Sequence, residues 1–241
     1  MSAMIPNATP YFRRLLFRSA LGLPACAAVV TLCYFFIDRP AAFFVRDHGL
    51  DRARPLRWLT YSPMWFEAVA AIVVVYAAVR RAWRPLSRIE RTLFAAGVAL
   101  IVAVALEYYL KALFGRYWPG TWVRDNPSLL DTGAYGFHPF HFGDWYGSFP
   151  SGHTARAFAP LTALWVAYPR LLLPGLAVCL SVVVGLVGMD YHFVGDTVGG
   201  AYLGLTTGAY TAAFFGLPAR AEGDNGLPEP TSKPGSPWSR T

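Results

Sequence analysis

Two short stretches of the chain carry residue types that bind anions and attack them. The first is Phe149-Pro150-Ser151-Gly152-His153, which opens an apolar run that we expect to be helical. Free backbone N–H groups and the positive end of the helix dipole at such a start favour an oxyanion such as phosphate. His153 is therefore placed beside a bound anion, and Ser151 and Gly152 can donate a hydroxyl and a backbone N–H to it.

The second stretch is Tyr191-His192-Phe193-Val194-Gly195-Asp196. His192 and Asp196 are four residues apart, so that within one helical turn the carboxylate can accept a hydrogen bond from one ring nitrogen. The other ring nitrogen is then available as a nucleophile or base. With His153, this pair supplies the nucleophile and the general acid of a displacement reaction.

Lys111 is the candidate cation for the bound anion. It lies near the end of another apolar run, four residues after Glu107. Ionisable residues within apolar runs are costly and mark functional sites by default. The alternative is a mutually neutralising ion pair at the membrane edge, because Glu107 precedes Lys111 by one helical turn.

In their order along the chain, these motifs resemble those of the phosphatidic acid phosphatase type 2 family, the membrane relatives of vanadium-dependent haloperoxidases. The family pattern is Lys-x6-Arg-Pro, then Pro-Ser-Gly-His, then Ser-Arg-x5-His-x3-Asp. The chain has Lys111 with Pro119 at the family spacing, the complete Pro-Ser-Gly-His tetrapeptide, and His192 with Asp196. The resemblance implies that His192 attacks phosphorus to form a phosphohistidine, that Asp196 holds its ring, and that His153 protonates the leaving oxygen.

The resemblance also implies a lipid phosphate substrate in a membrane and no metal or other cofactor. The charge on the phosphoryl oxygens is then met by Lys111, the Ser151 hydroxyl and the Gly152 N–H. Candidate substrates are polyprenyl diphosphate, phosphatidic acid, phosphatidylglycerol phosphate and lipid A phosphates, among which the sequence does not choose. Two alternatives stay open: a lipid phosphotransferase of the same family, and a catalytically silent member that binds lipid phosphate.

Two arginines of the family pattern are replaced, by Trp118 and Leu186. A lysine does not reproduce the planar, bidentate contact that arginine makes with phosphate. If residues 115–119 are extended, Arg116 points the same way as Trp118 and can reach the same phosphate. Arg156 and Arg124 are the further candidates.

The composition predicts an integral membrane protein. Of the 241 residues, 55% are hydrophobic and only 15% are charged, a balance unlike that of a soluble domain. The net charge of +7 comes mostly from arginines in short clusters between apolar runs, which is typical of the flanks of membrane spans and argues against nucleic-acid binding. The three cysteines lie within apolar runs and predict neither a disulfide nor a metal site.

Hydropathy predicts an all-α fold, an integral membrane bundle of six helices. We expect a cytoplasmic N-terminal segment at 1–18, the membrane phosphatase domain at 19–217 and a disordered cytoplasmic tail at 218–241. Residues 38–62 are expected to form a loop, with a short interfacial helix as an alternative within it. The six expected spans cover about 19–37, 64–79, 93–114, 153–168, 171–189 and 197–215.

The distribution of lysine and arginine favours both termini in the cytoplasm, in a bacterial inner membrane. Lys111, His153, His192 and Asp196 then lie together at the outer face. In the last span, the glycines are spaced for close helix packing: Gly199, Gly200, Gly204 and Gly208. Nothing in the sequence indicates an oligomeric state.

A long connection, residues 115–149, joins two of the predicted spans and is rich in aromatic residues. Loops of this length are usually functional, and these aromatic side chains fit either an interfacial belt or a grip on the lipid substrate. His138, His141 and Asp144 are metal-ligand types close together. The alternatives for them are loop structure or a pH-sensitive lid.

Overall fold

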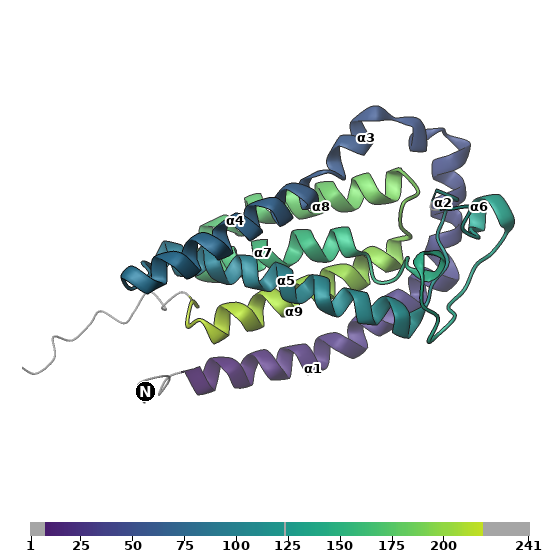
Figure 1. Cartoon of the computed structure of the whole chain (residues 1–241). Helices are drawn as coiled ribbons and strands as arrows, with labels where there is room; N and C mark the ends of the chain where they lie inside the picture. Colours follow the sequence, from purple (N-terminus) through teal and green to yellow (C-terminus); the bar gives the residue numbers. More distant parts are fainter. Residues whose placement is uncertain (1–7, 123, 219–241) are drawn as a thin grey trace, which may run out of the picture.

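The computed structural model describes residues 8–122 and 124–218, and over these residues the chain is all-α. Figure 1 shows the long helices running side by side in one bundle. All but the first residue of the predicted tail at 218–241 lies outside the described residues. The long helices are α1 (Ala8–Leu32), α4 (Ser62–Trp83), α5 (Arg88–Phe114), α7 (Gly152–Ala167), α8 (Leu172–Gly188) and α9 (Val194–Phe214).

The segment after α1 is mostly helical, so the expected loop is wrong and helix replaces it well beyond the one short helix that was allowed for. A π-helical turn, Cys33–Ile37, continues α1 into α2 (Asp38–Asp47), and α3 (Arg54–Leu59) follows. Pro40 does not break the helix, although it is the third residue of α2, directly after the π-helical turn. α2 therefore carries Asp38 across the end of the bundle.

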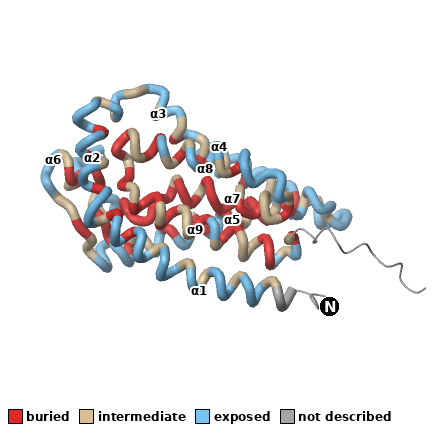
Figure 2. The backbone as a smooth tube through the Cα atoms, turned by 180° about the vertical axis from the view of Figure 1, so that it is seen from behind, coloured by how far each residue is buried: buried red, intermediate tan, exposed pale blue. Residues whose placement is uncertain are grey.

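Four helical stretches in the described part of the chain are long and apolar enough to cross a membrane: Tyr11–Asp47, Arg54–Trp83, Arg88–Phe114 and Pro169–Gly188. The predicted count of six membrane-spanning helices is therefore not confirmed. α7 is short, with 16 residues, and α9 is rich in glycine and threonine. Both helices lie in the buried centre of the bundle (Figure 2), so packing rather than hydropathy determines their composition.

Small residues bring α7 into close contact with its neighbours. A Cβ atom at Gly200 would lie 2.3 Å from the carbonyl oxygen of Ser151, and one at Gly208 would lie 2.4 Å from that of Ala159. α9 thus packs directly against the α7 backbone, as the glycine spacing predicts. On the other side, alanines line the contact between α5 and α7: Ala95, Ala99, Ala103, Ala155, Ala159 and Ala163.

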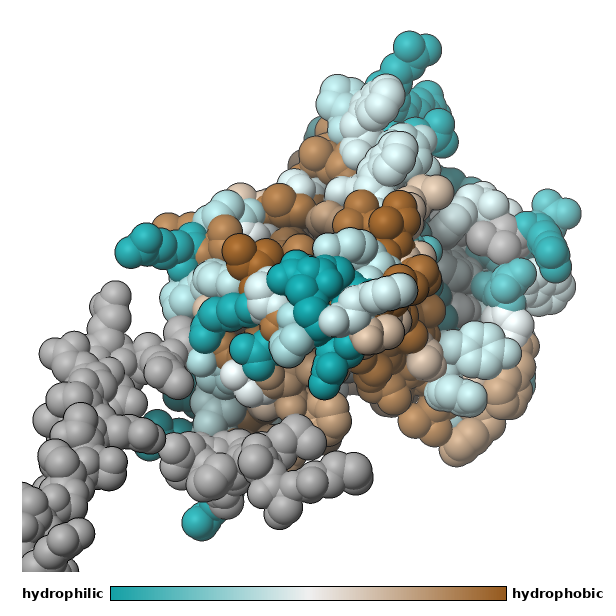
Figure 3. Space-filling view, turned by 60° about the vertical axis from the view of Figure 1, so that its left-hand side comes forward, coloured by the Kyte–Doolittle hydropathy of each residue, from teal (hydrophilic) through white to brown (hydrophobic). Residues whose placement is uncertain are grey.

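The two ends of the bundle differ in chemistry. The start of α1, the turn between α4 and α5 and the turn between α7 and α8 lie at one end (Figure 1). Figure 3 looks towards this end, where hydrophilic side chains gather and hydrophobic ones border them. The arginines of the α4–α5 turn, Arg80 and Arg84, pair there with Glu90. α2, α6 (Leu129–Thr132) and the long loop cover the opposite end.

Candidate active site

The Pro-Ser-Gly-His motif forms the start of α7, as predicted. Ser151 is the N-cap, and its Oγ accepts hydrogen bonds from the backbone N–H of Thr154 at 3.4 Å and from the Thr154 hydroxyl at 3.1 Å. Gly152 and His153 are the first two helical residues. Neither contact uses the hydrogen of the Ser151 hydroxyl, which remains available as a donor.

The second histidine lies just before α9, with its carboxylate partner in the first turn. Nδ1 of His192 lies 3.5 Å from Oδ2 of Asp196, slightly long for a hydrogen bond. The same Oδ2 accepts hydrogen bonds from the Ser148 hydroxyl at 2.5 Å and from the Phe193 N–H at 3.0 Å. These donors fix the buried carboxylate beside Nδ1, so that Nε2 is the ring nitrogen left for chemistry.

The fold brings the two motifs into one site. The backbone N–H of Ser151 donates to the carbonyl oxygen of Asp196 at 3.0 Å, which joins the starts of α7 and α9. The ring centroids of His153 and His192 are 6.5 Å apart. The two rings are thus close enough to act on one phosphoryl group as nucleophile and proton donor.

Two cations meet at one carboxylate beside these histidines. Lys111 Nζ lies 2.6 Å from Oε1 of Glu107, and Arg156 Nη1 lies 2.7 Å from Oε2. Glu107 is buried against the start of α7, where a Cβ atom at Gly152 would lie 2.1 Å from its Oε1. Glu107 therefore does more than neutralise Lys111, because it holds a lysine and an arginine together at a helix N-terminus.

A pocket of about 410 Å³ opens beside this cluster, lined by Lys111, Arg156 and Trp118 together with loop residues. The Trp118 ring lies 5.2 Å from the His192 ring, and Lys111 Nζ lies 5.9 Å from the Trp118 ring centroid. Its indole N–H donates to the carbonyl oxygen of Asp144 at 2.7 Å. Trp118 is thus a wall of the pocket, with its ring between His192 and Lys111.

Arg116 does not line this pocket, contrary to its expected contact with phosphate. Its side chain is fully buried, with Nη1 2.5 Å from Asp196 Oδ1 and Nη2 2.6 Å from Asp38 Oδ2. Burial alone would lower the pKa of Arg116, but the two carboxylates outweigh it and raise the pKa, so the guanidinium stays charged. Arg116 could contact phosphate only by giving up these two ion pairs.

The local backbone explains why Arg116 and Trp118 reach different targets. Gly115 ends α5 with φ +55°, where a Cβ atom would lie 1.9 Å from the carbonyl oxygen of His138. Isolated bridges at Arg116 and Trp118 show the expected extended chain. Two residues along such a chain span roughly 6.6 Å, so that Trp118 meets the His192 ring and Arg116 meets Asp196.

The other two arginines considered for phosphate contact lie in different places. Arg124 is 85% exposed and lies 3.8 Å from Asp144, away from the histidines. Arg156 lines the pocket. The side chain of Leu186 is fully buried in an apolar cluster with Val182 and Cys179, so that position offers no charge to the site.

Two residues of the site were missed by the sequence analysis. Asp38 accepts the backbone N–H of Gly195 at 2.9 Å as well as the Arg116 guanidinium. In the sequence, Asp38 is an acidic residue directly after an apolar run, the same kind of pattern that marked Glu107 as a functional candidate. Ser148 bonds Asp196, and no pattern in the sequence marked it.

The His138–Asp144 segment forms loop structure. The His138 ring packs 4.5 Å from the ring of Tyr117, and Nδ1 of His141 lies 3.1 Å from the His138 carbonyl oxygen. Across residues 8–122 and 124–218, no group of three or more histidine, cysteine or acidic side chains is arranged to hold a metal ion. The geometry thus favours the loop-structure alternative over a metal site.

Comparison with known proteins gives one match. The family model described as the PAP2 superfamily matches residues 92–218, which is just over half of the chain and spans α5 to α9. No curated protein and no solved structure matches. The matched region contains Lys111, His153, His192 and Asp196, the residues that the fold gathers at one end of the bundle. The chain therefore belongs to the PAP2 superfamily, which generally comprises phosphatases and phosphoesterases.

Proposed function

We propose that the protein is an integral membrane lipid phosphatase, which hydrolyses a lipid phosphate monoester or diphosphate through a phosphohistidine. The observation that carries the proposal is the pairing of His192 with Asp196 beside His153, at a helix start flanked by Lys111 and Arg156. A nucleophile, a proton donor and two cations are the groups that phosphoryl transfer needs when the charge is met by side chains.

In the first step, Nε2 of His192 attacks phosphorus, and the bond from phosphorus to the leaving oxygen breaks. His153 gives its proton to that oxygen, which avoids an expelled alkoxide or phosphate anion. Asp196 holds the Nδ1–H and stabilises the positive charge that develops on the ring. In the second step, water attacks the phosphohistidine, the P–N bond breaks, and the proton of the water passes to His153.

Lys111 and Arg156 form the phosphate clamp. Both cations contact Glu107, which holds them side by side next to the start of α7, and Arg156 also pairs with Glu67. The free N–H of Gly152 and the unassigned hydroxyl hydrogen of Ser151 add neutral donors at the start of α7. In the family pattern, arginines at two other positions contact phosphate. In this chain, Arg156 on α7 would supply the guanidinium instead.

The six long helices suit a six-span bundle, with α7 and α9 shielded from lipid by the others. The arginine-rich end opposite the site favours the cytoplasmic side, because basic residues accumulate at that side of membrane spans. We therefore place both termini in the cytoplasm and the site at the outer face of a bacterial inner membrane. A lipid phosphate would reach the pocket from the outer leaflet.

Phosphate release by the purified protein tests this function. The substrate panel holds the four lipid classes named above, with EDTA present to remove metal ions. We expect turnover in wild type and in His48→Ala, whose histidine lies on α2 away from the site and packs against Phe44. His192→Ala and His153→Ala should both lose turnover, and a trapped acid-labile phosphoryl group should be absent from His192→Ala.

The two alternatives give different results in the same assay. Release of free phosphate without an added acceptor argues against a phosphotransferase. A silent member would bind lipid phosphate tightly in wild type without any turnover. Turnover that disappears with EDTA would contradict the metal-independent mechanism.

A further inference from the structure

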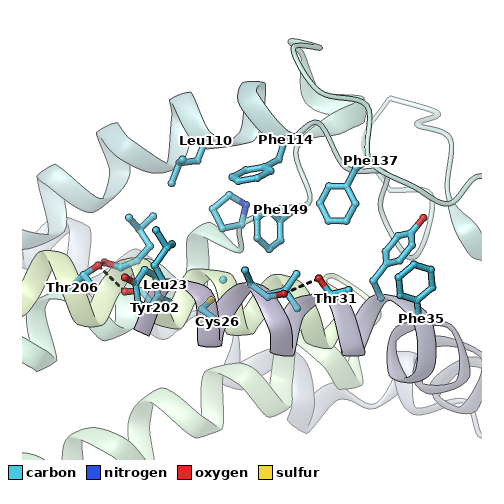
Figure 4. Close-up of a pocket in the computed structure, with 16 residues that line it drawn as sticks. Leu23, Cys26, Thr31, Phe35, Leu110, Phe114, Phe137, Phe149, Tyr202 and Thr206 are labelled. Atoms are coloured by element: carbon cyan, nitrogen blue, oxygen red, sulfur yellow. Dashed lines mark hydrogen bonds between the residues drawn. The ribbon is translucent and has the colours of Figure 1, made fainter. Parts of the chain in front are cut away.

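A second cavity, of about 500 Å³, lies between α1, α5 and α9 (Figure 4). α1 packs on α9, where the Tyr202 hydroxyl donates to the carbonyl oxygen of Ser19 at 2.9 Å. The cavity separates the second half of α1 from α5. Its walls are almost wholly apolar and include Leu23, Val30, Leu110, Phe114, Phe149 and Leu203.

This cavity is distinct from the pocket beside Lys111 and Arg156. The two lie on different sides of α5, since Leu110 and Phe114 line the cavity whereas Glu107 and Lys111 line the pocket. Between them stands the turn before α7, where the Phe149 ring packs 5.0 Å from the Phe114 ring. This turn separates the cavity from a lipid phosphate bound in the pocket at Lys111 and Arg156.

Three of the hydroxyls in the cavity wall donate to backbone carbonyl oxygens. Thr31 donates to the carbonyl oxygen of Ala27 at 2.8 Å, and Thr206 donates to that of Tyr202 at 2.7 Å (Figure 4). The Tyr202 hydroxyl donates to Ser19. These three hydroxyls therefore offer no donor to a ligand.

We propose that this cavity binds one hydrocarbon chain of a bilayer lipid, which is not the substrate. α1 and α5 belong to stretches long and apolar enough to cross a membrane, so the opening between them faces the hydrocarbon layer. The volume lies within the usual range for ligand pockets. The chain packs against Phe149 and Pro150, which precede Ser151, and so supports the turn that carries the catalytic motif.

Photo-crosslinking tests the proposal without relying on phosphatase activity. The full-length protein is reconstituted, without substrate, in phosphatidylcholine vesicles that contain an analogue with a photoreactive group in its acyl chain. Ala27→Trp fills the cavity, because Ala27 lines it. Ala25→Trp is the matched control, because Ala25 is exposed on the same helix and does not line the cavity. Crosslinked peptides are then mapped by mass spectrometry.

We expect crosslinks on the cavity-lining parts of α1, α5 and α9 in wild type and in Ala25→Trp. Ala27→Trp should reduce them about tenfold, which corresponds to about 1.4 kcal/mol of binding free energy. Equal labelling in both variants, or labelling spread evenly over the surface of α1, would overturn the proposal. Labelling of the cavity only by a photoreactive lipid phosphate, with a raised KM for it in Ala27→Trp, would assign the cavity to substrate and overturn it too.

Discussion

The Arg116 guanidinium holds the Asp196 carboxylate through the oxygen that does not face His192, at 2.5 Å. The other nitrogen of the guanidinium holds Asp38 at 2.6 Å. A buried chain of charges therefore runs from α2 through the long loop to His192. Because Asp196 accepts from several fixed donors, the orientation of the His192 ring depends on residues that need not touch substrate.

Arg116→Lys tests this positioning role. A lysine cannot hold both carboxylates in the fork geometry of a guanidinium, so one buried carboxylate loses its partner. We expect kcat to fall about 10- to 100-fold with KM little changed. Thermal unfolding should occur at a lower temperature, because breaking a buried ion pair costs about 3–5 kcal/mol. Steady-state kinetics and a melting curve measure both effects.

The matched control for this variant is Arg124→Lys, since the Arg124 side chain is 85% exposed. An exposed ion pair contributes about 0–1 kcal/mol, so its kinetics and melting temperature should stay near those of wild type. A rise in KM without a fall in kcat in Arg116→Lys would instead support direct contact with phosphate and restore the expectation from sequence.

Arg156→Gln tests the proposed clamp. If Arg156 contacts the phosphoryl oxygens, its loss removes a charge-assisted hydrogen bond of about 1.5–3 kcal/mol, and kcat/KM should fall about 10- to 100-fold. Inorganic phosphate should also inhibit more weakly. Arg156→Lys should recover part of the loss, because it restores the charge without the fork. Unchanged inhibition by phosphate in Arg156→Gln would exclude Arg156 from the clamp.

The sequence predicted the parts of the site that depend on local spacing. The start of α7 at Gly152 and the pairing of His192 with Asp196 depend on one helical turn each, so short-range patterns determine them. The Lys111–Glu107 pair follows from the same spacing. The four glycines of α9 predicted close packing because small residues in a helix allow another backbone to approach.

The features that the sequence did not predict depend on contacts between residues far apart in the chain. Whether Arg116 faces phosphate or Asp196 depends on where α2 places Asp38, and no pattern links residues so far apart. α7 and α9 do not meet the hydropathy criterion because they pack in the centre of the bundle. Arg156 becomes a site residue only through Glu107 on α5, a contact between two helices that single-sequence periodicity does not predict.

Gly204→Ala tests the packing between α7 and α9. A Cβ atom there would lie 2.5 Å from Cβ of Phe158 and 2.8 Å from the carbonyl oxygen of Ala155, so the helices must move apart. Overpacking costs about 1–3 kcal/mol, which offsets or exceeds the roughly 1 kcal/mol that alanine gains in helix propensity. We expect a lower melting temperature. The control is Gly120→Ala, where the nearest atom is 3.8 Å away; equal melting temperatures for both variants would contradict the prediction.

Asp190, in the turn that leads to His192, makes the stability of the fold depend on pH. It lies in the turn between α8 and α9, two residues before His192, with φ +51°, and its Oδ2 is buried without a hydrogen-bond partner. Burial, reinforced by the charge of Asp51, raises the pKa of Asp190 to about 7. The native state therefore binds a proton more tightly than the unfolded chain does, so this residue stabilises the fold least when it is ionised.

Asp190→Asn should remove this dependence. Asparagine tolerates positive φ and carries no charge. Because the folded pKa is raised, the contribution of Asp190 to wild-type stability is largest below about pH 4 and is lost as the pH rises from about 4 to about 7. The variant lacks this loss, so the melting temperature of the variant should rise relative to that of wild type between about pH 4 and pH 7 and stay level above that. If the melting temperatures of wild type and variant change in parallel across that interval, Asp190 is ionised in the native state over the whole range. Another group would then satisfy its Oδ2.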